Sequence, residues 1–383
     1  MSKNSNKTRV LHILPNFTLG GAELLVKNLL LFSNREKFES AACSLFPKGF
    51  TTSSDMIETE LEENNIKLFY LNKSLGPDLK IIINLYRLFK SFRPQVIHIH
   101  LYILAYTLLP ALLCRIPVRI HTVHSVADNP DVPRLSSLSY RLSYKLFRVQ
   151  PIGISPVVSR SVEKLYNIPT VPFIYNGIPT NSYNHDRNNA NLNLSFKLPD
   201  NKYVIIHVGR FTPAKNHRLL IKAFARVVAE MPEAILLLVG DGELKSEIQS
   251  LANLKNLSDK VKFLGFRKDI PELLAISDLF VLSSDWEGGP LVVMEAMAAG
   301  KPVVATPVGC VPDMISDNVN GLIVKPKDVN SLAKAILQLA KDYPMAQKMG
   351  ELGRQIAREK FDIKITTRRY EGLYENLLNK IPV

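Results

Sequence analysis

Two glutamates beside a glycine-rich turn are the first residues whose pattern suits chemistry. In the segment SSDWEGGPLVVMEAMAAG, residues 283–300, Glu287 precedes an expected helix and Glu295 lies one to two turns inside it. An unpaired carboxylate in such an apolar stretch is costly, so both glutamates should have partners. The hydroxyl pairs of a polyhydroxy ligand are natural partners, because ionised carboxylates accept strong hydrogen bonds. A structural ion pair between Glu295 and a neighbouring lysine or arginine is the alternative.

The turn between these glutamates, Gly288-Gly289-Pro290-Leu291, predicts the start of a helix. Proline suits the first helical position because it has no N–H group to leave unpaired. The free N–H groups of a helix N-terminus attract anions. The turn therefore predicts a helix end that points toward a ligand.

A second loop carries two cations, Arg210 and Lys215, after an apolar run at 203–208. A guanidinium fork and a compact ammonium can grip a diphosphate from two directions. A pair of solvated surface cations is the alternative. A third loop, Gly20-Gly21, lets backbone N–H groups approach a ligand, although ordinary helix capping with Glu23 in the first turn also explains it.

These loops follow apolar runs that alternate with amphipathic stretches in both halves of the chain. In the first half the expected elements are 9–14, 23–32, 40–46, 78–92, 96–99, 118–121, 152–154 and 173–175. In the second half the expected strands are 203–208, 235–239, 261–264, 279–282, 303–305 and 322–324. This rhythm predicts an α/β protein with two doubly wound, Rossmann-like domains facing across a cleft. Ligands of such sheets lie beyond the carboxyl ends of the strands.

An asparagine-rich stretch at 180–202 interrupts the rhythm and is typical of a linker or surface loop. We therefore expect a first domain over 1–180 and a second over 181–363. The tail at 346–378 is expected to be helical throughout. Its last piece, 364–383, is expected to pack back on the first domain.

The net charge of +13 is concentrated in one quarter of the chain. Residues 64–160 contain thirteen lysines or arginines and three aspartates, which is +10 of the total. Within them, RLSSLSYRLSYKLFR, from Arg134 to Arg148, places leucines at helical spacing among basic residues, as in a helix that lies on anionic lipid. A solvated basic face over an ordinary core helix is the alternative. Nucleic acid is not expected, because no zinc-finger, RNP-type or KH-type motif accompanies the charge.

Residues 94–114 carry no formal charge, but polar residues and prolines interrupt them. A buried strand followed by a buried helix is therefore predicted instead of a membrane span. The three cysteines lie far apart, which argues against a disulfide framework or a zinc site. The apolar stretch at 10–14 is too short for a secretory signal. A cytoplasmic location is expected, with peripheral attachment to the cytoplasmic face of the membrane as a hypothesis.

Together these motifs resemble the retaining family-4 glycosyltransferases of the two-domain GT-B fold, over almost the whole chain. The specific mark is the E-x7-E pattern of Glu287 and Glu295. Supporting motifs are GGAE at 20–23, HTVH at 121–124, YNGI at 175–178 and GDGEL at 240–244. The resemblance implies a nucleotide-diphosphate sugar donor, preferably a UDP-sugar, and a glycan or lipid-linked acceptor in surface polysaccharide or glycoconjugate assembly.

The resemblance also implies roles for residues of the second domain. Arg210 and Lys215 would hold the diphosphate, and the backbone from Gly265 to Arg267 would meet the base. Glu295 would bind the ribose hydroxyls, and Glu287 the hydroxyls of the transferred sugar.

In the first domain, the resemblance places His124 against the sugar as a positioning and transition-state group, with Gly20 and Gly21 beside the phosphates. His100 and His121 are interpreted more readily as hydrogen-bonded histidines at strand ends. The segment Gly309-Cys-Val-Pro-Asp departs from the common family pattern, with cysteine where glycine is frequent and aspartate where glutamate is frequent.

No D-x-D motif occurs in the chain, so no metal cofactor is expected and cations with helix dipoles would meet the leaving-group charge. The resemblance implies retention of anomeric configuration by same-face attack. Two other functions stay open: a nucleotide-sugar epimerase of GT-B-like fold, and a non-catalytic, membrane-associated nucleotide-sugar-binding module.

Overall fold

The computed structural model describes residues 7–18, 20–51, 54–127, 134–185 and 202–380. The chain divides into two compact units. Unit 1 comprises Met1–Gly177 and Ile363–Val383, and unit 2 comprises Ile178–Asp362. The first crossing between the units therefore lies three residues before the boundary predicted at residue 180, and most of the asparagine-rich stretch lies outside the described residues.

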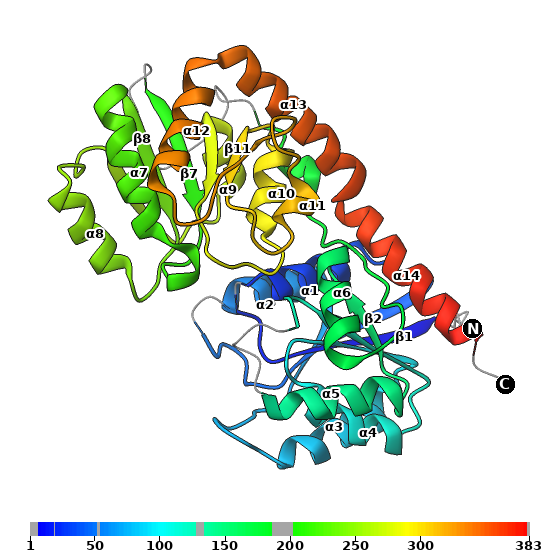
Figure 1. Ribbon diagram of the computed structural model, residues 1–383. Coiled ribbons are helices and arrows are strands. Elements are labelled where there is room, and N and C mark those ends of the chain that lie inside the picture. Colours follow the sequence, from blue (N-terminus) through cyan, green and yellow to red (C-terminus); the bar gives the residue numbers. More distant parts are fainter. Residues whose placement is uncertain (1–6, 19, 52–53, 128–133, 186–201, 381–383) are drawn as a thin grey trace. The chain divides into compact units, whose positions relative to one another are not determined.

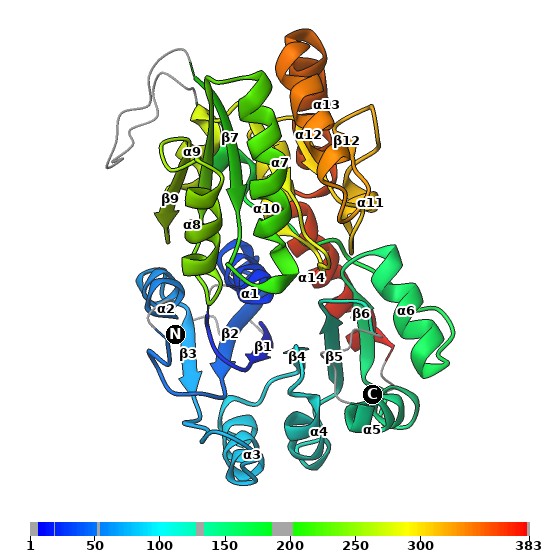
Figure 2. The same cartoon turned by 60° about the vertical axis from the view of Figure 1, so that its left-hand side comes forward.

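Unit 1 is built on a six-stranded parallel sheet of order β3-β2-β1-β4-β5-β6, which Figure 2 shows across the view. The strands are β1 (Thr8–Leu14), β2 (Phe38–Ser44), β3 (Lys67–Tyr70), β4 (Val96–His100), β5 (Val118–Val123) and β6 (Gln150–Gly153). The helices are α1 (Gly21–Phe32), α2 (Ser54–Glu63), α3 (Lys80–Phe92), α4 (Leu104–Leu113), α5 (Arg134–Lys145), α6 (Pro156–Tyr166) and α14 (Ile363–Asn379). The strand order reverses beside β1, which is where open α/β sheets bind ligands.

Apolar side chains cover both faces of this sheet, as a parallel sheet requires. Leu85 and Phe89 of α3 pack with Leu11 and Ile13 of β1 in one cluster, which also includes Tyr140 of α5. The other face is covered by α1, α2 and α14. Figure 1 shows α3, α4 and α5 as neighbours along the outer side of unit 1.

Helix α14 returns the end of the chain to the core of unit 1. Tyr370 and Tyr374 are buried against β-strand residues. The Tyr374 hydroxyl lies 2.7 Å from His98 Nδ1, and the Tyr370 hydroxyl lies 3.1 Å from Thr122 Oγ1. The last helix therefore supplies hydrogen-bond partners to polar side chains buried in the sheet.

Unit 2 contains a second six-stranded parallel sheet, of order β12-β11-β10-β7-β8-β9. Its strands are β7 (Tyr203–Val208), β8 (Ala234–Val239), β9 (Val261–Gly265), β10 (Leu279–Leu282), β11 (Val303–Ala305) and β12 (Leu322–Ile323). Its helices are η1 (Thr180–Tyr183), η3 (Pro213–Lys215), α7 (His217–Glu230), α8 (Lys245–Leu254), α9 (Ile270–Ile276), α10 (Leu291–Ala298), α11 (Val311–Met314), α12 (Val329–Lys341) and α13 (Tyr343–Lys360). Both doubly wound sheets were predicted from the sequence and are confirmed.

Some local predictions need correction. Helices α2 and α6 and strand β3 were not predicted, and residues 173–175 form no strand but a single bridge from Phe173 to Gly153. The tail is not one continuous helix, because α13 and α14 are separated at Phe361 and Asp362. There the chain pairs with Ile178, whose N–H donates to the Phe361 carbonyl at 2.9 Å.

The uncharged stretch 94–114 forms β4 and α4, as predicted. Helix α4 is not wholly buried, since Leu109 and Leu113 are exposed. Among the described residues, no helix combines the length and apolarity needed to cross a bilayer.

Replacing Tyr374 with Phe should lower the free energy of unfolding by about 1–3 kcal/mol, because His98 Nδ1 would stay buried without its partner. Tyr343→Phe is the matched control, since Tyr343 is 73% exposed. Urea unfolding followed by circular dichroism measures both variants. Equal unfolding midpoints would contradict the placement of α14 in this core.

Candidate functional site

The loops that follow β7 and β10 are joined by a partly buried ion pair. Lys215 Nζ lies 2.6 Å from Glu287 Oε1, and the two side chains are only 19% and 10% exposed. The Ser284 hydroxyl donates to the same oxygen at 2.6 Å. Strands β7 and β10 are neighbours in the sheet, so their carboxyl ends bring together residues that are 72 positions apart.

Two further hydrogen bonds hold these loops together. Asn216 caps α7 by accepting from the Leu219 N–H at 3.1 Å, and its amide donates to Asp285 Oδ1 at 3.0 Å. The Ser283 hydroxyl donates to the Lys215 carbonyl at 3.0 Å. None of these partners was predicted, because their pairing depends on the neighbouring strands and leaves no local sequence signal.

Arg210 follows β7 and is exposed. Within the described part of the chain, its guanidinium has no ion pair or side-chain hydrogen bond, whereas Lys215 is engaged by Glu287. The loop that carries Arg210 packs tightly against residue 240. A Cβ on Gly240, where φ is +131°, would lie 2.2 Å from the Gly209 carbonyl oxygen, so only glycine fits there.

The turn before α10 packs against the loop at 309–313. A Cβ on Gly309, where φ is +55°, would lie 2.4 Å from the Glu287 carbonyl oxygen. The N–H of Cys310 donates to the Gly288 carbonyl at 3.0 Å. Cys310 has φ −85°, a conformation open to any residue, so cysteine in place of the frequent glycine imposes no backbone strain.

Helix α10 begins one residue later than predicted. Pro290 is the N-cap, and Leu291 is the first helical residue. Together with Gly288 and Gly289, they form the turn between Glu287 and the helix. The predicted glycine-rich helix N-terminus is therefore present at the carboxyl edge of the sheet.

Glu295 lies in α10 and is half-buried. Tyr183 of η1 is buried beside it and is hydrogen-bonded to its carboxylate. Burial raises the pKa of Tyr183 well above its usual range, and the neighbouring Glu295 charge raises it further. Sequence reasoning missed Tyr183, which lies 112 positions from Glu295 in a stretch interpreted as a linker.

Gly265 ends β9 with φ +64° and with open space where a side chain would project. Arg267, two residues on, pairs with Asp269, with Nε 2.8 Å from Oδ1. The N–H of Gly240 donates to the Gly265 carbonyl at 2.8 Å. These contacts place the segment 265–267 beside the loop that follows β8.

In unit 1, Gly20 is the N-cap of α1, and Gly21 is its first residue. A Cβ on Gly20 would lie 2.4 Å from Glu23 Oε2, and the Thr18 hydroxyl lies 3.5 Å from Glu23 Oε1. The first glycine therefore leaves room for a buried carboxylate, which goes beyond simple capping.

His124, directly after β5, is linked to other histidines of the sheet. Its Nε2 lies 3.1 Å from His100 Nδ1, while its own Nδ1 is buried without a hydrogen-bond partner. Burial lowers its pKa to about 3. His121 is a hydrogen-bonded histidine, as interpreted from the sequence, with Nδ1 2.7 Å from the Tyr144 hydroxyl and Nε2 2.8 Å from the Leu101 carbonyl.

Three buried histidines of unit 1, His12, His98 and His100, lie close enough together to share a metal ion. His98 already uses both ring nitrogens, at 2.7 Å from the Tyr374 hydroxyl and 2.7 Å from Thr122 Oγ1. A metal would have to break one of these bonds. The three residues are therefore better described as hydrogen-bonded histidines than as a metal centre.

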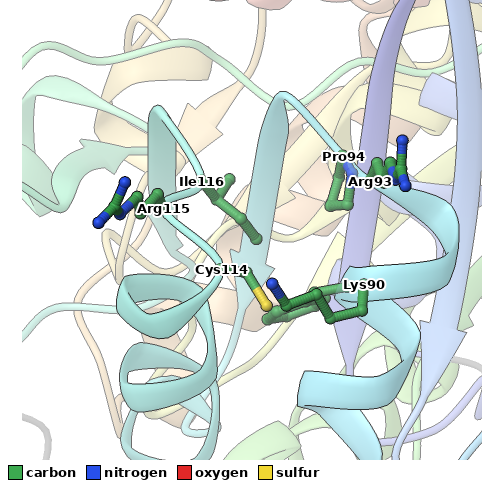
Figure 3. A pocket seen from close by; sticks show the side chains of 7 residues that line it. Lys90, Arg93, Pro94, Cys114, Arg115 and Ile116 are labelled. Atoms are coloured by element: carbon green, nitrogen blue, oxygen red, sulfur yellow. The ribbon is translucent and has the colours of Figure 1, made fainter.

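A pocket of unit 1 lies at the amino ends of β4 and β5, at the opposite edge from these candidate residues. Figure 3 shows Lys90 and Cys114 directed into it, while the guanidinium groups of Arg93 and Arg115 point away on either side. Its position and basic lining suit an anion on the outer surface better than a substrate of the sheet's carboxyl edge.

Two doubly wound sheets with glycine-rich loops at their carboxyl edges are the architecture of GT-B glycosyltransferases, which many other proteins with such sheets share in part. Two family models match the chain: "Glycosyl transferases group 1" over residues 191–356 and "Glycosyltransferase Family 4" over residues 19–182. The chain belongs to the family-4 glycosyltransferases of GT-B fold.

Two proteins illustrate what this chain resembles in sequence. The chain is 34% identical over 205 residues to the N-acetyl-alpha-D-glucosaminyl L-malate synthase of Bacillus anthracis, a match that spans 54% of this chain and 53% of that protein. It is 27% identical over 305 residues to the UDP-Gal:alpha-D-GlcNAc-diphosphoundecaprenol alpha-1,3-galactosyltransferase of Escherichia coli, spanning 74% and 77% of the two chains.

Among solved structures, Anabaena HepE in complex with UDP and glucose matches 96% of this chain and all of that chain. The TM-score is 0.84 at 23% identity, a likeness that establishes the fold.

Gly309→Ala should destabilise unit 2 by about 1–3 kcal/mol, because the new Cβ would meet the Glu287 carbonyl at positive φ. Gly372→Ala in α14 is the control: nothing lies within 4 Å of its added Cβ, and alanine favours a helix by about 0.5–1 kcal/mol. Chemical denaturation compares the two variants. A Gly309→Ala protein as stable as the control would show that the loop at 309–313 does not pack on Glu287.

Proposed function

We propose that this protein transfers a sugar from a UDP-sugar to a hydroxyl of a lipid-linked or glycan acceptor, with retention of configuration and without a metal ion. The observation that carries this proposal is the arrangement at the carboxyl ends of β7 and β10. There Arg210, which has no ion pair among the described residues, lies on the same loop as Lys215 of the partly buried Lys215–Glu287 pair. The names of the E. coli galactosyltransferase and of the HepE complex support a UDP-linked donor.

In this proposal, different residues of unit 2 bind different chemical groups of the donor. Arg210 offers a free fork of N–H donors for phosphate oxygens, and Lys215 adds a point charge near them. Glu287 and Glu295 offer carboxylate oxygens to sugar and ribose hydroxyls. Their present partners, Ser284 and Tyr183, hold the carboxylates in place. The first N–H groups of α10 add a partial positive charge for the diphosphate.

In the proposed reaction, the bond between the anomeric carbon and the phosphate oxygen breaks while the acceptor oxygen bonds to the same face of that carbon. The acceptor proton passes to the departing phosphate. Arg210, Lys215 and the α10 N-terminus stabilise the charge that develops on the phosphate. His124 of unit 1 positions a substrate oxygen through its Nδ1.

We also propose that unit 1 rests on an anionic membrane surface that presents the acceptor. In α5, the buried side is formed by Tyr140 and Tyr144. Leu138 and Leu142 lie outward instead, 64% and 41% exposed. The alternative of a core helix with only a basic outer face does not explain these leucines, whereas a helix lying on lipid does.

The neighbouring helices extend the same kind of surface. Ile83 of α3 and Leu113 of α4 are also exposed, and Lys90 is directed into the pocket between these two helices (Figure 3). Among the described residues of these helices, all charged side chains are basic. A surface of apolar and basic side chains suits a membrane, in which acyl chains lie below phosphate headgroups.

Arg210→Ala should lower kcat by about 100- to 1,000-fold, which is the usual loss for one preorganised oxyanion group. Transfer from a UDP-sugar to a lipid-linked acceptor is measured with EDTA present, and wild-type activity should be unaffected. Arg218→Ala is the control, since Arg218 is exposed and paired with Glu247. Turnover of Arg210→Ala within a fewfold of wild type, or loss of activity in EDTA that manganese restores, would contradict the proposal.

Incubation with the donor alone separates transfer from epimerisation. An epimerase converts the UDP-sugar without acceptor, whereas the proposed transferase leaves its sugar configuration unchanged.

For the membrane surface, the double variant Arg141→Ala and Lys145→Ala should weaken binding to phosphatidylglycerol vesicles about 30-fold, at about 1 kcal/mol for each basic residue. The control replaces Arg358 and Lys360, which are exposed on α13 of unit 2. Vesicle sedimentation at low and high salt measures both. Binding that ignores ionic strength, or that is equal for the two double variants, would exclude this surface.

A further inference from the structure

Five histidines of unit 1 lie near the carboxyl edge of its sheet, four of them buried and His124 partly buried, and three of the five form a chain. His12 Nδ1 lies 3.3 Å from His100 Nε2, and His100 Nδ1 lies 3.1 Å from His124 Nε2. His12 and His100 are 3% and 0% exposed. The other two, His98 and His121, bond to tyrosines of α14 and α5 instead.

The three chain members are neutral at physiological pH. Burial lowers the pKa of His12 and of His124 to about 3, and it lowers the pKa of His100 well below its usual range. A neutral imidazole carries one N–H and one lone pair. His100 must therefore donate to one neighbour and accept from the other.

This restriction couples the tautomers of all three rings. If His12 donates to His100, then His100 donates to His124 Nε2, and His124 must carry its proton on Nδ1. If the direction is reversed, His124 Nδ1 is a bare acceptor. Whether His124 Nδ1 carries a proton thus depends on the tautomer of His12, two rings away.

The free end of the chain needs a partner. His124 Nδ1 is buried and makes no hydrogen bond within the described part of the protein. A buried polar atom without a partner costs about 1–3 kcal/mol, a penalty that a ligand can relieve. Phosphate oxygens only accept hydrogen bonds and hydroxyl oxygens can accept them, so the Nδ1–H tautomer fits the substrates proposed above.

We propose that His100 and His12 are positioning residues that hold His124 in its Nδ1–H tautomer and thereby present a hydrogen-bond donor to a substrate oxygen. The proposal rests on the proposed function for the identity of the substrate, but the tautomer itself is a property of the free protein. Partners on the second nitrogen of a functional histidine fix ring orientation in the same way at metal sites.

The test uses full-length protein with 15N-labelled imidazole rings, which gives resonances from eight histidines. Wild-type His124 should show a single tautomer with the proton on Nδ1. His12→Leu and His100→Leu should give a mixture of His124 tautomers. They should also lower kcat by roughly 10- to 100-fold, the usual effect of removing such a partner, with KM for the sugar donor within about threefold of wild type.

Conservative variants guard against misfolding. His12→Asn keeps an amide at the Nδ1 position that faces His100, and His100→Asn keeps one at the position that faces His124. His12→Asn should restore both the single tautomer and most of kcat relative to His12→Leu. His100→Asn should keep the His124 ring ordered while it loses the coupling to His12.

His98→Leu is the matched control, because His98 is as buried as His100 and stands on the same strand but lies outside the chain. It should lower the melting temperature yet leave the His124 tautomer and kcat within about twofold of wild type. A His124 tautomer that survives His12→Leu, or a loss of kcat in His98→Leu as large as in His12→Leu, would overturn the proposal. If no sugar transfer is found but the coupling is seen, the proposed function fails and the coupling stands.

Discussion

The candidate site of unit 2 depends on the partly buried ion pair between Lys215 and Glu287. An exposed pair of this kind contributes little to stability, but here both charges are largely removed from water, and the loss of either would leave the other uncompensated. Ser284 and the bond between Asn216 and Asp285 complete the arrangement. The pair therefore ties the loop after β7 to the turn before α10, and it fixes the base of the loop that carries Arg210.

Close backbone packing makes this arrangement possible. Gly240 and Gly309 each lie where a Cβ would collide with a carbonyl of the neighbouring loop. The loops after β7 and β8 can then approach one another, as can the turn before α10 and the loop after β11. In unit 1 the comparable constraint is that buried histidines need hydrogen-bond partners. One of these partners is Tyr374, which lies on the last helix of the chain.

Much of the fold was predictable from local pattern. Strands such as β8 and β10 are short, fully apolar runs, and α1 follows its strand at the expected place. Two of the missed elements have weak patterns: α2 is largely acidic and polar, and β3 has only four residues at the edge of its sheet. The tail was predicted as one helix because the break between α13 and α14 is caused by the pairing of Asp362 with Ile178. This contact involves a distant segment and leaves no local sequence signal.

By itself, the sequence determined which residues could do chemistry, since Arg210, Lys215 and Glu287 stand in loops that follow strands and Glu295 stands in the helix that follows one of these loops. Such signals are local, because strand and helix periods involve neighbours along the chain. Only the tertiary structure decided that Lys215 pairs with Glu287, that Tyr183 lies beside Glu295, and that Leu138 and Leu142 of α5 face outward. These pairings depend on which strands become neighbours and on which face of a helix packs against the core. Both are determined by burial and hydrogen bonding between segments that are distant in the sequence, and a local hydrophobic period contains no information about such contacts.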